Sequence, residues 1–514
     1  MKNEVQLIAY VDRLGGGGFA ELGALLAGPL AGLFGGLHLL PFFHRIDGVD
    51  AGFDPVDHTL VDARLGSWAD IRALAAQVDV MADVIVNHVS SESPQFLDYL
   101  AQGARSRHAG LFLTLDRVFP NGATERDLAA IYRPRPGLPF TIFALAGGER
   151  RVLWTTFTPR QIDIDVRDAG GRAYLEGILR TFADNGIRLV RLDAAGYAVK
   201  KAGGSCFMTP ETFAFIDEFA AAARALGIEV LVEVHSHFRK QIEIAARVDW
   251  VYDFALPPLV LHALAFRTAV RLREWIRIRP SNALNVLDTH DGIGVIDIGA
   301  DAAARTERPG LIPDDELDRL VEAIHERSGG ESRRATGAAA SNLDVYQVNC
   351  TFYDALGRND REYLIARAIQ FFLPGVPQVY YVGLLAGSND LELLARTGVG
   401  RDINRHYYGP REVEAALGRP VVADLCELIR LRNTHPAFSG RFEADSPDDA
   451  SLVLRWVAGE AQVELTVSFA TGAMTLIATG AAGPRPIVLR SFASGAAPAG
   501  CRPPLGQSRN DAAS

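Results

Sequence analysis

The stretch "GIRLVRLDAAGYAVKKAG" at residues 186–203 begins as a buried strand and ends in charged residues. An apolar run at residues 187–190 leads directly into Arg191, Leu192 and Asp193. Side chains alternate along a strand, so Arg191 and Asp193 share one face while Leu192 points to the other. Burying a charge is costly unless it is paired or has a chemical role. The stretch therefore predicts a core strand that presents an arginine and a carboxylate side by side at its end.

Seven further apolar runs accompany this strand, and amphipathic segments lie between most of them. The eight strand candidates are residues 5–10, 36–42, 78–86, 186–193, 227–234, 248–255, 282–288 and 375–382. Helical patterns include residues 67–77, 169–184, 210–226, 258–276 and 360–372. Continuous apolar strands that alternate with helices predict an α/β protein with a (β/α)8 TIM barrel. A doubly wound open sheet is the alternative, but no glycine-rich dinucleotide-binding turn follows the first strand.

Two long interruptions and an alternating C-terminal segment predict additions to this barrel. Residues 87–168 and 292–358 are too long for structureless loops in a compact domain, so we expect two inserted subdomains. The barrel itself would comprise residues 1–86, 169–291 and 359–435. Residues 436–492 carry short alternating runs that predict an antiparallel β domain, with a last strand in "RPIVLRSF" (485–492). The polar segment 493–514 is predicted to be a frayed tail.

Composition and charge narrow the class of protein. A hydrophobic content of 48% with 22% charged residues is typical of a soluble globular chain. The formal net charge of −10 argues against a nucleic-acid partner. Four scattered cysteines without a CxxC pair favour reduced thiols over a disulfide framework or a zinc site. The N-terminus shows no signal peptide, so we expect a cytoplasmic protein.

Two segments could suggest a membrane span or a phosphate-binding loop. Residues 22–43 carry no Asp, Glu, Lys or Arg, and a membrane helix needs about 20 apolar residues. Pro29 and the pair Gly35 and Gly36 break this run, so we interpret it as a helix, a turn and a strand rather than a membrane segment. The four glycines at 15–18 lack a following Lys-Ser/Thr, which favours a loop after the first strand over a P-loop.

Polar side chains gather where the predicted strands end, and this is where (β/α) barrels place their active sites. They are Asn87, His88, Arg191, Asp193, Glu233, His235, Asp288, His290 and Asp291. A single strand-end Asp or His is more often a cap, a salt bridge or a structural residue. Asp193 and Glu233, however, lie one repeat apart and would face the same opening. Two carboxylates about 5 Å apart are what a retaining glycosidase needs, as nucleophile and as acid/base.

The motifs "DVIVNH" (83–88), "VRLDAAGY" (190–197), "EVHS" (233–236) and "LDTHD" (287–291) resemble, in order and spacing, the four motif regions of the α-amylase superfamily. Longer stretches resemble the sucrose phosphorylases within it, over residues 1 to about 440. They include "LPFF…DGVDAGFDPVDH" (40–58), "FPNGATERDLAAIYRPRPGLPF" (119–140), "GGSCFMTP" (203–210), "DTHDGIGVIDIG" (288–299), "GAAASNLDVYQVN" (337–349), "FFLPGVPQVYYVG" (371–383) and "GRDINRHYY" (400–408).

The resemblance implies a role for each carboxylate. Asp193 would be the nucleophile, which Arg191 beside it would keep ionised. Glu233 would be the acid/base and must begin protonated, which an enclosed site with few compensating charges would favour. Asp291 would stabilise an oxocarbenium-like transition state. On the glucose side the family's binding positions are Asp50, Phe53, His88, Phe157, Arg191, His290 and Arg401, although plain core packing is the simpler interpretation of either phenylalanine.

On the acceptor side, the resemblance implies a second set of residues that serve fructose and then phosphate. They are Arg135, Tyr197, His235, Asp344, Tyr346 and Gln347. Arginine suits phosphate because its planar fork binds oxygen atoms in pairs, although a solvated loop charge is the simpler interpretation of Arg135. Val345 stands where many relatives carry leucine. Close relatives use other acceptors, such as glycerate, glycerol or a phosphorylated fructose.

The expected activity is reversible, retaining phosphorolysis of sucrose to α-glucose 1-phosphate and fructose. A related glucoside phosphorylase, or a sucrose hydrolase or transglucosylase, is the alternative within enzymes. A non-catalytic amylase-like binding protein would be expected to lack the carboxylates and to carry a membrane anchor. We expect no metal or organic cofactor, no nucleic-acid or membrane partner, and a possible homodimer.

Overall fold

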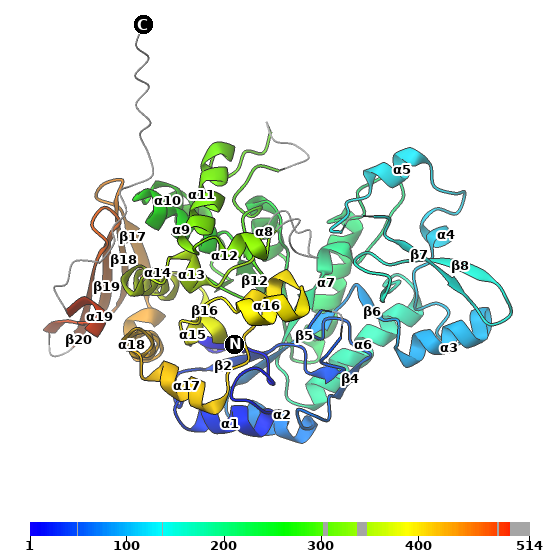
Figure 1. Ribbon diagram of the computed structural model, residues 1–514, viewed down its shortest axis with the longest axis horizontal. Helices are drawn as coiled ribbons and strands as arrows, with labels where there is room; N and C mark the ends of the chain where they lie inside the picture. Colours follow the sequence, from blue (N-terminus) through cyan, green and yellow to red (C-terminus); the bar gives the residue numbers. More distant parts are fainter. Residues whose placement is uncertain (49, 136, 302–306, 337–346, 481–482, 494–514) are drawn as a thin grey trace, which may run out of the picture.

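The computed structural model describes residues 1–48, 50–135, 137–301, 307–336, 347–480 and 483–493. Eight parallel strands form a closed barrel at its centre (Figure 1). They are β1 (Gln6–Ala9), β2 (Gly36–Leu39), β5 (Asp79–Ile85), β10 (Leu189–Asp193), β11 (Glu229–Val232), β12 (Trp250–Asp253), β13 (Ala283–Asn285) and β16 (Val376–Tyr380). Each strand pairs with the next in this order, and β16 pairs with β1. The predicted (β/α)8 barrel is confirmed, and each predicted apolar run contains one of its strands.

Strand β10 has the alternation that the sequence predicts. Val190 and Leu192 are fully buried, whereas Arg191 and Asp193 share the other face, with Arg191 Nη1 3.0 Å from Asp193 Oδ1. The parallel register of β10 against β5 sets Arg191 opposite Asp83. This pairing brings a second carboxylate to the buried arginine.

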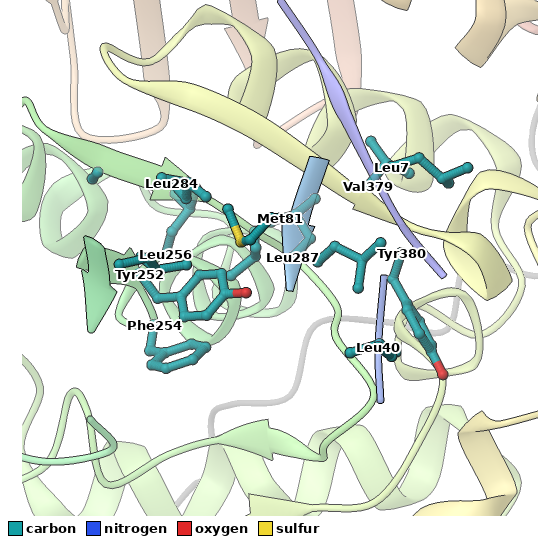
Figure 2. Packing of buried hydrophobic residues seen from close by; sticks show 14 of the residues in the cluster. Leu7, Leu40, Met81, Tyr252, Phe254, Leu256, Leu284, Leu287, Val379 and Tyr380 are labelled. Atoms are coloured by element: carbon teal, nitrogen blue, oxygen red, sulfur yellow. The ribbon is translucent and has the colours of Figure 1, made fainter. Parts of the chain in front are cut away.

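Side chains from many barrel strands form one continuous apolar core, because each strand is covered on both sides. Figure 2 shows members of this cluster from β1, β5, β12, β13 and β16, among them Met81, Tyr252 and Leu284. The rings of Tyr252 and Phe254 lie 4.8 Å apart, centroid to centroid.

Helices follow the barrel strands and cover the outside of the ring. They are α1 (Phe19–Ala27), α2 (Trp68–Ala75), α6 (Ala169–Asp184), α7 (Pro210–Ala225), α8 (Phe238–Ala245), α9 (Leu256–Phe266), α10 (Val270–Ile278), α14 (Asp360–Phe372), α15 (Tyr381–Leu384), α16 (Leu391–Thr397), α17 (Pro410–Leu417) and α18 (Pro420–Thr434). Short 3-10 turns are η2 (Ala195–Tyr197) and η4 (Gly400–Asn404). Helix α7 begins where the sequence favours it, since the Thr209 hydroxyl caps Thr212 N and Pro210 occupies the first turn. The helix–turn–strand interpretation of residues 22–43 is confirmed by α1 and β2.

The single helix predicted at 258–276 is wrong, because the chain breaks there into α9 and α10. Arg267 ends α9 in the left-handed conformation, with φ at 56°. The carbonyl oxygen of Asp449 accepts hydrogen bonds from the Thr268 hydroxyl (3.1 Å) and Ala269 N (2.6 Å). The break therefore serves a tertiary contact with the C-terminal sheet, which helical periodicity does not reveal.

Small elements fill the first long interruption and the connection after β2. They are β3 (Phe43–His44), β4 (Asp57–Val61), β6 (His88–Ser90), α3 (Pro94–Gln102), η1 (Gly103–Arg105), α4 (Leu115–Val118), α5 (Glu125–Ala130), β7 (Phe140–Ala144), β8 (Arg150–Trp154) and β9 (Gln161–Asp163). Strand β6 continues from the end of β5 and pairs antiparallel with β9, with His88 opposite Asp163. This pairing ties the excursion to the barrel rim.

The second interruption and the C-terminus contribute the remaining elements. They are β14 (Ile293–Gly294), α11 (Asp314–Arg327), α12 (Glu331–Arg334), β15 (Gln347–Val348), α13 (Phe352–Ala355), η5 (Pro436–Ser439), β17 (Arg441–Asp445), β18 (Ser451–Ala458), β19 (Ala461–Ser468), β20 (Ala473–Gly480), β21 (Gly483–Pro486) and α19 (Arg490–Ala493). Strands β17 to β21 form the predicted antiparallel sheet, and Trp456 Nε1 donates to the carbonyl oxygen of Phe372 on α14 at 2.7 Å. The domain boundaries given above stay predictions.

The strand predicted across 485–492 is wrong from residue 487 onward. Strand β21 ends at Pro486 and the chain turns into the short helix α19. Asp424 of α18 accepts hydrogen bonds from Arg490 N, Ser491 N and the Ser491 hydroxyl, which holds the start of α19 against the barrel. The tail predicted at 493–514 lies almost entirely outside the described residues.

The C-terminal sheet and the first excursion lie on opposite sides of the barrel (Figure 1). Among the helices of the described residues, none is long and apolar enough to cross a membrane.

Candidate active site

A pocket of about 230 Å³ opens where the barrel strands end. Every described residue of the predicted site lines it, except Arg191, which lies beneath two of the carboxylates. The lining comprises Asp50, Phe53, His88, Tyr132, Arg133, Pro134, Arg135, Phe157, Gln161, Asp193, Ala194, Gly196, Tyr197, Phe207, Glu233, Val234, His235, His290, Asp291, Ile296, Gln347 and Arg401. Asp344 and Tyr346, together with Val345, lie outside the described residues.

One buried guanidinium joins the two carboxylates that sequence reasoning paired. Arg191 Nη1 lies 3.0 Å from Asp193 Oδ1, and Nη2 lies 2.7 Å from Glu233 Oε1. Nη1 also contacts Asp83 Oδ1 at 2.5 Å. Asp193 is the last residue of β10 and Glu233 directly follows β11, so adjacent strands position both groups. Burial disfavours the charge of the arginine, and the anions on either side of it oppose this effect.

The electrostatics of this cluster correct two expectations. Arg191 lowers the pKa of Asp193, as predicted, but burial and then the charge of Glu233 outweigh it, so the pKa of Asp193 is raised. Few compensating charges were expected around Glu233, yet Arg191 Nη2 is 2.7 Å and His235 Nε2 is 3.8 Å from its Oε1. The nucleophile is therefore less acidic, and the acid more closely paired, than the sequence predicts.

Asp291 has the opposite environment, because two arginines face it. Arg401 Nη1 lies 2.9 Å and Arg405 Nη2 3.8 Å from its Oδ1. Burial would raise the pKa of Asp291, but Arg401, His290 and Arg405 together hold it far below the usual range. The same arginines lie 3.5 Å from the oxygens of Asp50 and likewise keep its pKa low despite burial. Asp291 and Asp50 are therefore fixed anions.

Aromatic rings and neutral histidines form the walls between these charges. Phe53 stacks on His290, with ring centroids 4.7 Å apart and planes at 9°. Phe157 packs against His88 at 5.2 Å. Burial lowers the pKa of His290 to about 3 and also lowers that of His88, so both rings are neutral near pH 7. Both phenylalanines line the pocket, which favours the binding interpretation over plain core packing.

The four described residues that were predicted to serve the acceptor also line the pocket; they are Arg135, Tyr197, His235 and Gln347. Tyr197 lies between Phe157 and Phe207, at centroid distances of 5.1 and 4.7 Å. Burial alone would lower the pKa of His235, but Asp297 and then Glu233 raise it to about 9, so the ring is cationic near neutrality.

Among the residues that the structure describes, one cluster has the spacing of a cation site, and a bound cation does not fit it. Glu233, His235 and Asp291 each place one ligand atom within 4.8 Å of the other two. His235 is protonated near neutral pH, and a metal ligand must be neutral. The carboxylates are already held by Arg191 and Arg401.

Sequence reasoning missed several residues that hold the site together. Asp83 forms an ion pair with Arg191 and also contacts His38. His38 Nε2 lies 3.1 Å from Asp83 Oδ2. Arg405 Nε donates to the carbonyl oxygen of His290 at 2.9 Å. Lys200 Nζ lies 2.5 Å from Asp163 Oδ2 and 2.5 Å from Asn87 Oδ1, which fixes the first excursion to the rim.

Part of this set carried a signal in the sequence. Asp83 stands inside the quoted motif "DVIVNH", and Arg405 stands inside "GRDINRHYY". Neither could be given a partner before the register and the loop contacts were known. Asp297 stands inside "DTHDGIGVIDIG" and Lys200 inside the stretch at 186–203, and they likewise had no partner that the sequence could name.

Comparison with known proteins shows which family the chain belongs to. No protein-family model matches the chain. It is 62% identical over 480 residues to a sucrose phosphorylase from Agrobacterium vitis, spanning 93% of this chain and 98% of that protein. It is 55% identical over 466 residues to the sucrose phosphorylase of Bifidobacterium adolescentis, spanning 91% of this chain and 92% of the relative. The chain belongs to the sucrose phosphorylase family.

A solved structure agrees with this placement. The sucrose 6F-phosphate phosphorylase from Thermoanaerobacter thermosaccharolyticum superimposes with a TM-score of 0.87 at 37% sequence identity, covering 95% of this chain and 97% of that one. The fold of this chain is thus shared with a phosphorylase of known structure.

Proposed function

We propose that this member of the sucrose phosphorylase family converts sucrose and phosphate into α-glucose 1-phosphate and fructose through a covalent glucosyl–enzyme. The observation that carries the proposal is the contact of Arg191 with both Asp193 and Glu233 at the bottom of the pocket. It sets a nucleophile and an acid side by side, as a double displacement requires. The two sucrose phosphorylases of 62% and 55% identity support sucrose as the donor.

In the first half of the reaction, a carboxylate oxygen of Asp193 attacks the anomeric carbon of the glucosyl unit. Glu233 gives its proton to the departing fructosyl oxygen, and fructose leaves. The mechanism therefore requires Glu233 to be protonated and Asp193 to be ionised when sucrose is bound. The contact between Arg191 Nη1 and Asp193 favours the ionised form of the nucleophile.

Positive charge that develops on the glucosyl ring meets a fixed anion. Asp291 is ionised at all working pH values, because Arg401 and Arg405 hold its pKa low. It therefore stabilises the transition state without first losing a proton. Asp50 and the walls formed by Phe53 and His290 position the sugar against Asp193.

In the second half, phosphate replaces fructose on the acceptor side. A phosphate oxygen attacks the anomeric carbon, the bond to Asp193 breaks, and Glu233 takes up the proton that the phosphate loses. Arg135 and His235 line this end of the pocket and supply positive charge to a chain with a net charge of −10. Two inversions restore the starting configuration, so the product is the α-phosphate.

The experiment is an assay of purified protein with sucrose, with and without phosphate. We expect fructose and α-glucose 1-phosphate in equal amounts, and the anomer is read by phosphorus NMR. Release of the β-phosphate would contradict the double displacement, and equal sucrose cleavage without phosphate would show a hydrolase.

The reverse reaction tests the acceptor. With glucose 1-phosphate as donor, fructose should be used at least tenfold better than fructose 6-phosphate, glycerol or glycerate. A reversed order would assign the protein to one of the related phosphorylases. A homodimer stays a prediction. A measurement of the molecular mass in solution tests it.

A further inference from the structure

His235 is held on three sides by residues that leave its ring one orientation. The ring of Phe254 stacks on it, with centroids 3.9 Å apart and planes at 17°. Asp297 Oδ2 lies 3.1 Å from Nδ1. Gly294 makes room for this pair, since a Cβ there would lie 2.4 Å from Asp297 Oδ2 and 3.1 Å from His235 Nδ1. A side chain at 294 would therefore separate the two groups.

Asp297 is itself anchored by two residues that follow His235 in the chain. Its side chain is fully buried, and Oδ1 accepts hydrogen bonds from Ser236 N at 3.2 Å and from Gln241 Nε2 of α8 at 2.8 Å. Oδ2 is left for the imidazole. A buried carboxylate with these contacts stays in place while ligands exchange in the pocket.

The other ring nitrogen of His235 is available to a ligand. Within the described part of the chain, Nε2 has no hydrogen-bond partner, and it lies 3.8 Å from Glu233 Oε1. His235 lines the pocket next to the group that exchanges a proton with each acceptor. A buried N–H without a partner is costly, so it favours a ligand that accepts from it.

We propose that Asp297 is a positioning residue for the phosphate half of the reaction, which keeps His235 as a cation whose Nε2–H binds an oxygen of the incoming phosphate beside Glu233. The proposal deepens the phosphorolysis proposed above and rests on it. Asp297 touches no substrate and acts through His235 alone.

The charges around His235 explain why Asp297 is needed. Glu233 and Asp291 face the ring from the loops after β11 and β13, and both favour its charged form. Burial opposes them, and Arg191 offsets Glu233 at the same oxygen. Arg135 and Arg401 line the same pocket, whereas Phe254 and Gly294 carry no charge. Asp297 provides the largest stabilising contribution, and with it the pKa reaches about 9.

The two half-reactions need this cation to different extents. Phosphate is an anion with three acceptor oxygens, whereas the fructosyl unit of sucrose is neutral. Charge-assisted hydrogen bonds are about twice as strong as neutral ones. Loss of the charge on His235 should therefore weaken capture of phosphate by the glucosyl–enzyme far more than cleavage of sucrose.

The test is Asp297→Asn, which keeps the shape of the side chain and removes its charge. At pH 7.5 we expect kcat/KM for phosphate to fall at least tenfold, and kcat/KM for sucrose to fall less than threefold. The ionisation of phosphate affects both proteins equally, so it cancels when kcat/KM of the variant is divided by that of the wild type. An equal loss in both half-reactions would overturn the proposal, because a disturbed fold affects both.

The pH dependence of this ratio gives a second readout. Without the Asp297 charge, burial lowers the pKa of His235 below its wild-type value of about 9. Between those two values the wild-type ring is charged and the variant ring is neutral, so the defect should be largest there. It should shrink above pH 9, where both rings are neutral. A defect that is constant across this range contradicts a role through His235.

Two further variants separate this outcome from loss of stability and from failure of the proposed function. Asp424→Asn removes the charge of another buried aspartate with three hydrogen bonds, far from the pocket, and should leave both half-reactions unchanged. In a His235→Gln background, Asp297→Asn should cause no further loss for phosphate, and an additive loss would overturn the proposal. If wild-type protein cleaves sucrose without needing phosphate, the proposed function fails, whatever the variants do.

Discussion

Arg191 and Lys200 are both buried cations held by carboxylates, but the regions around them serve different ends. Arg191 lies under the pocket, and two of its partners, Asp193 and Glu233, keep 15% and 11% of their side chains exposed. The side chains of Lys200 and Asp163 are only 1% and 0% exposed. Because Asp193 and Glu233 are partly exposed, a substrate can reach them. Lys200 and Asp163 are closed to solvent, so a substrate cannot reach their ion pair. The same interaction thus supports chemistry at one place and attachment of the first excursion at the other.

Asp193→Asn should have the largest effect. It removes the attacking anion, so no glucosyl–enzyme can form, and turnover should fall by about 10⁴-fold or more, equivalent to about 5.4 kcal/mol of barrier. The melting temperature should stay within a few degrees, since the amide relieves the crowding of two carboxylates around Arg191. Sucrose turnover and thermal unfolding measure the two effects. More than a tenth of wild-type turnover would rule Asp193 out as nucleophile.

Lys200→Met tests the ion pair that is closed to solvent, and its effect should fall on stability. The change leaves the Asp163 carboxylate buried without its cation, and breaking such a pair typically costs about 3–5 kcal/mol. Urea unfolding measures the loss. The double variant Lys200→Met/Asp163→Asn removes both charges and should recover part of it. If the losses in unfolding free energy of Lys200→Met and Asp163→Asn simply add in the double variant, the two residues are not coupled.

Glu233→Gln separates the role of Glu233 from that of Asp193, the other carboxylate at Arg191. General acid catalysis contributes about 10²- to 10⁴-fold, so sucrose cleavage should slow by at least 10²-fold. α-Glucosyl fluoride needs no proton on its leaving group, so its cleavage should be much less affected. Initial rates on the two donors decide the matter, and equal losses would show that Glu233 is not the acid.

Arg135→Ala should have the smallest effect. We expect the KM for phosphate to rise about tenfold, because a charge-assisted hydrogen bond is worth about 1.5–3 kcal/mol. Sucrose cleavage in water should change little. A phosphate titration of initial rates measures the shift, and an unchanged KM would place the phosphate site elsewhere.

Much of the barrel and the pocket could be predicted before any contact was known. Apolar runs of the right length give strands whatever their neighbours are, and the eight predicted runs all contain barrel strands. Polar residues that follow such runs must meet at one rim, because parallel strands in a barrel end on the same side. That geometric rule brought Asp193, Glu233 and Asp291 to one pocket.

Elements whose form depends on a distant partner were predicted poorly. The break between α9 and α10 follows from hydrogen bonds to Asp449, and the end of β21 follows from the capping of α19 by Asp424. Neither partner is near in sequence, so a local pattern favoured a continuous helix and a longer strand.

The barrel, the three carboxylates at its rim and the family resemblance could be recognised from the chain alone, because periodicity and motif order are local properties. The pairing of charges depends instead on the folded structure. Arg191 meets Asp83 across 108 residues, and His235 meets Asp297 across 62. These pairs depend on strand register and loop paths, which are fixed when the barrel closes. They set the charge state of the site, since the interaction between charges depends on distance and burial rather than on order along the chain.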